Sequence, residues 1–252
     1  MNEFYSDVYR RLYHASEGPD EEFFSDQFRR GEKLANRISH LAPPNSRVLE
    51  IGCGAGGIVS AFTNNGYNTS GIDFDERFLE FGRQRRLDLR GDTLEEWSEN
   101  VDVVVLSHVL EHLTNPRDFL EKIHGILKEQ GLLVIEVPNV YSIGRTYGGS
   151  FRTYIQFAHV FHFDRWSLDK ILGASGFKRI KADRLTIGVY QRSSIFPTGA
   201  PHISKTRRSW RMTVFMTHLL AVRALSLVLI PALKLVQLIL SVRRQTRQNF
   251  FY

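Results

Sequence analysis

A glycine-rich turn directly after a short apolar segment is the part of this 252-residue chain best suited to chemistry. Val48, Leu49 and Ile51 predict a buried strand, and the glycines that follow can adopt positive φ and let a ligand lie against bare backbone. A helix expected to begin at Ile58 would add free N–H groups at its N-terminus. This arrangement predicts a site for a cofactor that contains adenosine.

Two kinds of cofactor fit the turn. Gly52, Gly54 and Gly57 match the G-x-G-x-x-G pattern of dinucleotide-binding enzymes, and Asp73 follows at about the distance of a ribose-binding acid. Glu50 favours another cofactor, because a carboxylate two residues before the first glycine would repel a pyrophosphate. The same carboxylate would attract the cationic group of an amino acid.

Histidines at three positions are candidate catalytic residues, since histidine can take a proton near neutral pH. His108 follows a predicted strand over 101–106, at the edge of the sheet where ligands bind. His159 and His162 lie in an irregular aromatic segment, 144–163, which we expect to form a lid over the substrate. Each of these histidines could instead be a hydrogen-bonded packing residue.

The remaining reactive side chains are expected to be structural. Glu111 and His112 follow the same predicted strand, where capping or supporting roles are more usual than catalysis. Cys53 is the only cysteine, which excludes an intramolecular disulfide, and its place inside the turn favours a space-filling role over a nucleophilic one. His, Asp and Glu show no convincing metal-ligand spacing, so we predict no obligatory metal.

The elements that position these residues alternate between strands and helices over residues 47–139, which predicts a parallel sheet with crossover helices. Residues 179–187 and 188–192 predict an antiparallel pair at its end. Residues 1–44 are expected to form an N-terminal helical segment, with Pro43 and Pro44 marking the boundary. The fold class is therefore α/β, with a doubly wound sheet.

Several motifs in this order resemble the class I S-adenosylmethionine-dependent methyltransferases. The acid and alternating glycines of the turn come first, followed by a Leu-Glu-His-Leu signature within 107–113 and a strand over 132–139 that ends in Pro-Asn. A helix over 167–177 completes the set. The resemblance covers roughly residues 40–192. It implies a seven-stranded, mostly parallel sheet with a terminal antiparallel strand, formed by a domain over residues 45–192.

The resemblance also implies S-adenosylmethionine as the cofactor. In this family an acid such as Asp73 binds the ribose hydroxyls, one such as Asp92 lies near the adenine amine, and a residue such as His108 lines the methionine portion. The residues expected to bind the cofactor are Glu50, Gly52, Cys53, Gly54, Gly56, Asp73, Phe74, Asp92, Thr93, Ser107 and His108. Asp73 could instead cap the next helix, and Asp92 and Thr93 could form an ordinary turn.

The implied reaction is methyl transfer, most simply to oxygen of a small-molecule or lipid-linked acceptor, as in quinone-type and polysaccharide-associated O-methyltransferases. Such an enzyme holds the acceptor atom in line with the C–S bond, about 3 to 3.5 Å away, and a hydroxyl acceptor also needs a general base. Two other functions stay open. One is a non-catalytic scaffold that binds the cofactor and acts through its C-terminal tail, and the other is an NAD-dependent oxidoreductase.

The C-terminal extension, residues 193–252, differs from the rest of the chain. No acidic residue follows Asp183, whereas Lys and Arg are frequent on both sides of an apolar, helical stretch over 213–242. Arg223 and Lys234 interrupt this stretch and disfavour a full membrane span, at a cost of about 2.5 to 3.5 kcal/mol each near the bilayer centre. The extension could lie on an anionic membrane surface, pack on its own domain or form a homodimer.

Location and partners follow from the same features. The N-terminus is too polar for a signal peptide, so we expect a cytoplasmic protein, either free or peripheral at the inner face of the membrane through residues 205–247. No nucleic-acid partner is expected, because the basic residues flank an apolar segment instead of lining a polar surface.

Overall fold

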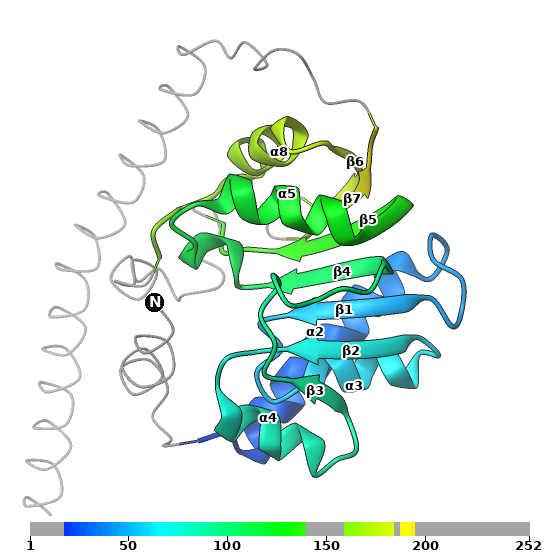
Figure 1. The fold of residues 1–252 in the computed structure, drawn as a ribbon, viewed down its shortest axis with the longest axis vertical. Coiled ribbons are helices and arrows are strands. Elements are labelled where there is room, and N and C mark those ends of the chain that lie inside the picture. Colours follow the sequence, from blue (N-terminus) through cyan, green and yellow to red (C-terminus); the bar gives the residue numbers. More distant parts are fainter. Residues whose placement is uncertain (1–17, 140–158, 184–186, 195–252) are drawn as a thin grey trace, which may run out of the picture. The chain divides into compact units, whose positions relative to one another are not determined.

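The computed structural model describes residues 18–139, 159–183 and 187–194. Its strands form a seven-stranded sheet in the order β3-β2-β1-β4-β5-β7-β6 (Figure 1). The strands are β1 (Arg47–Ile51), β2 (Asn68–Ile72), β3 (Asp88–Arg90), β4 (Val101–Ser107), β5 (Leu127–Glu136), β6 (Phe177–Ala182) and β7 (Ile187–Arg192). Neighbours from β3 to β5 are parallel, and β7 is antiparallel to both β5 and β6. The expected seven-stranded, mostly parallel sheet is confirmed.

Helices cover both faces of this sheet, as the alternation along β4 shows. Val103 and Val105 pack with residues of α2 and α3, whereas Val104 and Leu106 pack with residues of α5 and α8. The helices are α2 (Glu21–Ile38), α3 (Gly57–Asn64), α4 (Glu76–Arg83), α5 (Pro116–Ile126) and α8 (Arg165–Ala174). The sheet is therefore doubly wound, with an apolar layer on each side.

Local capping sets element boundaries that differ from the sequence expectation. The helix expected over 167–177 begins at Arg165, because Asp164 caps it through a reciprocal pair of hydrogen bonds with Ser167. It ends before Gly176, whose φ of 82° is incompatible with a continuing helix. Strand β6 begins and ends before the expected 179–187, whereas β7 begins at Ile187, one residue earlier than expected, and ends at Arg192 as expected.

Strand β1 lies at the point where the strand order reverses, with β2 on one side and β4 on the other. Glu50 is in register with Gly71 of β2 and Val105 of β4. In open α/β sheets the carboxyl ends of the strands at this point form the ligand-binding edge. The glycine turn and His108 both lie at this edge.

Residues 195–252 of the C-terminal extension and residues 144–158 of the expected lid fall outside the described residues. Among the helices that are described, none combines the length and apolar character needed to cross a bilayer.

Candidate active site

The turn after β1 has a backbone that only glycine tolerates easily. Gly52, Gly54 and Gly56 have φ values of 75°, 54° and 80°. A Cβ at Gly52 would lie 2.6 Å from Val109 Cγ2, and one at Gly56 would lie 2.8 Å from Leu89 Cδ1. Side chains at these positions would therefore strain the backbone and collide with neighbouring strands and loops.

Several backbone N–H groups of the turn are already bonded within the protein. Gly52 and Cys53 both donate to the Ile72 carbonyl, at 2.8 and 3.1 Å. Gly54 donates to Asp73 Oδ2 at 2.8 Å. A pyrophosphate needs such N–H groups to face it. Their use inside the protein argues against the dinucleotide interpretation that the glycine spacing left open.

Gln27 of α2 holds the two ends of the turn together. Its Nε2 donates to the Cys53 carbonyl, and its Oε1 accepts from the Gly57 N–H, each at 3.2 Å. The contact between Gln27 and the turn could not be predicted from the sequence, because no local pattern distinguishes this glutamine from other polar residues of an amphipathic helix. A side-chain clamp of this kind fixes the shape of the turn before any ligand binds.

The side chain of Cys53 packs in the interior of the protein. It is fully buried in a small apolar cluster with Val59, Leu79 and Leu89. Its Sγ would lie 2.8 Å from a Cβ added at Gly71. This placement supports the space-filling role, and any contact of Cys53 with the cofactor would be through its main chain.

Glu50 is a buried carboxylate that lacks a full set of partners. It is 1% exposed, and its Oε2 has no hydrogen-bond partner within the described part of the chain. Burial, and then the negative charge of Asp73, raise the pKa of Glu50 well above its usual range, although the Val59 N–H and the Arg30 guanidinium partly oppose this. The site is therefore short of positive charge, and a ligand cation would supply it.

Asp73 follows β2 and is held against the glycine turn. Its Oδ2 accepts from Gly54 N and its Oδ1 from Asp75 N, at 2.8 and 2.9 Å. The N-cap of α4 is Asp75, which accepts from the Arg77 N–H, so Asp73 is not needed as a cap. The neighbouring Phe74 is 52% exposed at the same edge.

Thr93 forms the ordinary turn that sequence analysis kept as an alternative. Its backbone N–H and its hydroxyl both donate to Glu96 Oε2 at 2.8 Å. Asp92 precedes it and is half-buried, two residues after β3 ends at Arg90. Asp92 therefore remains placed at the sheet edge, whereas the polar groups of Thr93 bond to Glu96.

Ser107 and His108 end β4 beside the end of β5. Ser107 Oγ donates to Glu136 Oε2 at 3.2 Å, and the His108 N–H donates to the Glu136 carbonyl at 2.9 Å. His108 has a φ of 58°, an uncommon value for a residue other than glycine. Strain of this kind is frequent at functional sites.

The structure brings His108 together with Glu111 and with histidines far away in the sequence. His108 Nδ1 lies 3.2 Å from Glu111 Oε1, and His112 Nε2 lies 3.9 Å from the same oxygen. The ring of His159 is 4.8 Å from that of His112 and 6.0 Å from that of His162, measured between centroids. We call these five residues the histidine cluster.

Burial and neighbouring charges set the protonation of this cluster. Burial alone would raise the pKa of Glu111, but the contact with His108 and the charges of His108 and His112 bring that pKa below its usual range. Burial, and then the charge of His112, lower the pKa of His159 to about 4. Partial burial also lowers the pKa of His162. His159 is therefore neutral near pH 7 and a weak base.

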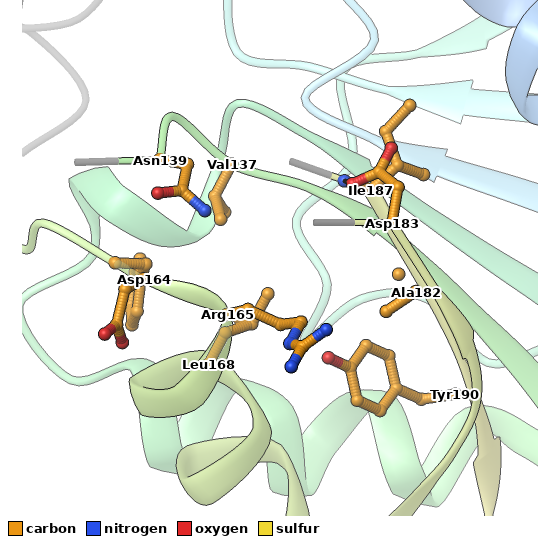
Figure 2. Close-up of a pocket in the computed structure, with 11 residues that line it drawn as sticks. Val137, Asn139, Asp164, Arg165, Leu168, Ala182, Asp183, Ile187 and Tyr190 are labelled. Carbon is orange, nitrogen blue, oxygen red and sulfur yellow. Dashed lines mark hydrogen bonds between the residues drawn. The ribbon is translucent and has the colours of Figure 1, made fainter. Parts of the chain in front are cut away.

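A small pocket lies further along the sheet, between α8 and the β6–β7 pair. It is lined by Val137, Asn139, Phe163, Asp164, Arg165, Leu168, Ala182, Asp183, Ile187, Gly188 and Tyr190. Figure 2 shows the Arg165 guanidinium extending from α8 toward the Tyr190 hydroxyl of β7. None of its lining residues belongs to the glycine turn or the histidine cluster.

A family model described as a methyltransferase domain matches residues 23–182. The match includes the glycine turn, Asp73 and the whole histidine cluster. The chain belongs to this methyltransferase family. The class I methyltransferase resemblance inferred from the motifs is thereby confirmed.

Relatives of this methyltransferase domain share part of their length with it. A Mycolicibacterium smegmatis protein named "Probable S-adenosylmethionine-dependent methyltransferase" is 29% identical over 182 residues, covering 69% of this chain and 66% of that protein. The ubiquinone biosynthesis O-methyltransferase of Bradyrhizobium sp. is 32% identical over 121 residues, covering 45% and 46%. The chain thus spans between about half and two thirds of the length of these relatives.

Solved methyltransferase structures have the same fold. The plantazolicin methyltransferase BpumL in complex with SAH aligns with a TM-score of 0.58 at 13% identity, over 76% of this chain and 93% of that one. The magnesium protoporphyrin IX methyltransferase of Synechocystis PCC 6803 with bound SAH aligns with a TM-score of 0.52 at 17% identity, over 76% and 98%. At these identities the likeness shows the fold alone.

S-adenosylmethionine is the cofactor of this methyltransferase domain. The residues present fit it on two independent observations. Glu50 offers a buried carboxylate oxygen that lacks a partner among the described residues, and the positive φ of Gly52, Gly54 and Gly56 leaves the main chain of the turn bare. The cation of an amino acid would pair with Glu50, whereas a pyrophosphate would be repelled by it.

Proposed function

We propose that this protein transfers a methyl group from S-adenosylmethionine to the oxygen of a small-molecule or lipid-linked acceptor. The observation that carries the choice of oxygen is the contact between His108 and Glu111 at the end of β4, because a hydroxyl acceptor requires a base and an amine or thiolate does not always need one. Ubiquinone biosynthesis O-methyltransferases among the relatives support the same choice.

In this proposal the cofactor lies along the carboxyl edge of β1, β2 and β4. Glu50 pairs with the ammonium of the methionine portion, Asp73 accepts hydrogen bonds from the ribose hydroxyls, and Asp92 accepts from the adenine amine. Phe74 would pack against the adenine, and Gly52, Gly54 and Gly56 would contact the cofactor through bare backbone. The bound cofactor supplies an electrophilic methyl group, and the protein only orients it and excludes water.

His108 is the proposed general base. Its Nδ1 faces Glu111 Oε1, so donation from Nδ1–H would leave the Nε2 lone pair to take the acceptor proton. Nε2 is 3.9 Å from Glu136 Oε1, beyond hydrogen-bond reach, which keeps it available. Glu111 would orient the ring and stabilise the imidazolium that forms, as a carboxylate does in other His-carboxylate pairs.

His159 and His162 are then assigned to the wall of the acceptor site. The low pKa of His159 makes it a poorer base than an ordinary histidine near neutral pH. The exposed Val160 and Phe161 lie between them and would give the wall an apolar surface. An acceptor with a hydroxyl on an apolar or aromatic body matches this combination.

The C-terminal extension has a separate proposed role. Its cations flanking an apolar stretch suit the headgroup region of an anionic membrane, where each basic residue contributes about 1 kcal/mol near the surface. The extension would bring a cytoplasmic enzyme to a lipid-linked acceptor at the inner face of the membrane. The alternatives are that the extension packs on the domain or forms a homodimer. Liposome flotation of the full chain and of a chain ending near Ser204 distinguishes membrane binding from both alternatives.

The test of the reaction uses S-adenosylmethionine carrying an isotopic label in its methyl group. The full chain is incubated with fractionated small-molecule and lipid extracts, and labelled products are identified by mass and fragmentation. The proposal expects a labelled methyl ether or ester. Label on carbon, nitrogen or sulfur would refute oxygen as the acceptor, and cofactor binding without any labelled product would favour the scaffold function.

A further inference from the structure

Three members of the histidine cluster converge on one point. Single ligand atoms of Glu111, His112 and His159 all lie within 4.8 Å of one another. Glu111 and His112 belong to the 3₁₀ helix η2 (Leu110–His112), and His159 comes from the segment that precedes α8. The Phe161 N–H donates to the Glu111 carbonyl at 3.0 Å, which ties that segment to η2.

Polar atoms of Glu111 and His159 at this point lack hydrogen-bond partners among the described residues. Glu111 is 1% exposed, and neither of its carboxylate oxygens has a hydrogen-bond partner of good geometry among the described residues. The buried Nδ1 of His159 also has no hydrogen-bond partner among the described residues. His108 Nδ1 is near enough to Glu111 Oε1 for an electrostatic contact, but it leaves the second oxygen without one. Buried polar groups in native proteins are nearly always paired, so an unseen partner is the simplest explanation.

A metal ion is the partner that suits these donors. Two imidazole nitrogens and one carboxylate oxygen form a ligand set of zinc sites that keep a fourth position open. Magnesium and calcium prefer oxygen ligands alone, which makes them a poor match. Bonds of about 2.1 Å place tetrahedral ligand atoms about 3.4 Å apart. The ligand atoms that lie furthest apart would therefore move roughly 1 Å closer to one another when the ion binds. Small rotations of the side chains allow a movement of this size.

We propose that Glu111, His112 and His159 bind a divalent transition-metal ion of the zinc type. The ion would keep one position for water or for an oxygen of a ligand. The site adjoins His108 through Glu111, so it lies beside the proposed acceptor site. The inference stands on the ligand geometry and does not depend on which acceptor is methylated.

Sequence spacing does not reveal this site, because one of its ligands lies far along the chain from the other two. The proposal therefore departs from our expectation of no obligatory metal, which was based on the absence of a convincing metal-ligand spacing in the sequence. No ligand of the proposed ion belongs to the glycine turn, so the ion and the cofactor do not share a ligand there.

The experiment measures metal binding on the full chain, with any histidine tag removed and the protein stripped by a chelator. Zn²⁺, Co²⁺ and Mg²⁺ are titrated separately by calorimetry, and bound metal is counted after dialysis. Co²⁺ also reports its ligand geometry through its visible absorption. The expected result is one Zn²⁺ per chain, a tetrahedral Co²⁺ spectrum and far weaker Mg²⁺ binding.

Variants locate the ion. His159→Gln and Glu111→Gln should each weaken Zn²⁺ binding by about 100-fold or more, since even residues that only support metal ligands change affinity by about 10- to 100-fold. His162→Gln is the matched control, because His162 neighbours His159 but is outside the ligand set. If Glu111→Gln does not fold, His159→Gln still tests the proposal, because His159 is only partly buried. Absence of stoichiometric Zn²⁺ binding, or His159→Gln binding Zn²⁺ as the original protein does, would overturn the proposal.

Discussion

Replacing Glu50 with glutamine should stabilise the cofactor-free protein while weakening its hold on S-adenosylmethionine. Without cofactor, the buried carboxylate has an oxygen without a partner, and its pKa is raised by burial and by Asp73. Glutamine has nearly the same shape and no charge. Glu50→Gln therefore removes an electrostatic cost from the free protein and an ion pair from the complex.

The magnitudes follow from the burial of the group. Leaving a buried polar group unpaired costs about 1 to 3 kcal/mol, and more when it is charged, so the variant should gain about this much in unfolding free energy at pH 8. For a domain of this size each kcal/mol raises the melting temperature by about 2 to 4 °C. Loss of a buried charge partner should cost the complex about 2 kcal/mol or more, equivalent to at least about a 30-fold loss of affinity.

The pH dependence of the unfolding free energy predicts independently that Glu50→Gln stabilises the folded protein. Because the pKa of Glu50 is raised in the folded protein, the unfolded chain loses this proton at lower pH than the folded chain does. Glu50 therefore lowers the unfolding free energy progressively as the pH rises from the unfolded pKa to the folded pKa. The advantage of Glu50→Gln should be absent in acid, grow over that interval and then level off.

The assay is urea unfolding across this pH range, followed by calorimetric titration with S-adenosylmethionine. Glu22→Gln, at an exposed position of α2, is the matched control and should change stability by no more than about 0.5 kcal/mol. The reasoning would be refuted by a variant that is less stable than the original protein at every pH, or by one that binds the cofactor equally well.

Further predictions concern the ribose acid, the base and the extension. Asp73→Asn should weaken S-adenosylmethionine binding by about 10- to 150-fold, through loss of charge-assisted hydrogen bonds worth about 1.5 to 3 kcal/mol, and unchanged affinity by calorimetry would remove Asp73 from the cofactor site. His108→Gln should lower kcat for methyl transfer by about 10²- to 10⁴-fold with a smaller change in KM, and unchanged kcat would exclude it as the base. A chain ending near Ser204 should lose flotation with anionic liposomes, whereas equal flotation would exclude the extension as a membrane anchor.

The sheet and its cofactor edge could be predicted from the sequence because their signals are local. An apolar strand running into glycines, with an acid two residues before them, specifies a turn conformation and a charge within a few residues. The positive φ values of Gly52, Gly54 and Gly56 agree with that interpretation. Helix boundaries were less predictable, since single caps such as Asp164 decide them.

Contacts between distant segments could not be predicted in this way. Gln27 reaches the glycine turn from α2, and nothing in the helical pattern of α2 marks it. His159 meets His112 only after the chain has passed through β5 and returned. Glu111, expected to be merely structural, lies at the centre of the histidine cluster because η2 turns its side chain inward.

The most direct test of the central claim compares two cofactors on the unmodified full chain. Calorimetric titration should show saturable binding of S-adenosylmethionine at one site per chain and no heat above dilution for NADH. This preference is expected from the buried carboxylate of Glu50 and from the turn N–H groups that are bonded within the protein. Saturable NADH binding, with none for S-adenosylmethionine, would contradict the account of the site.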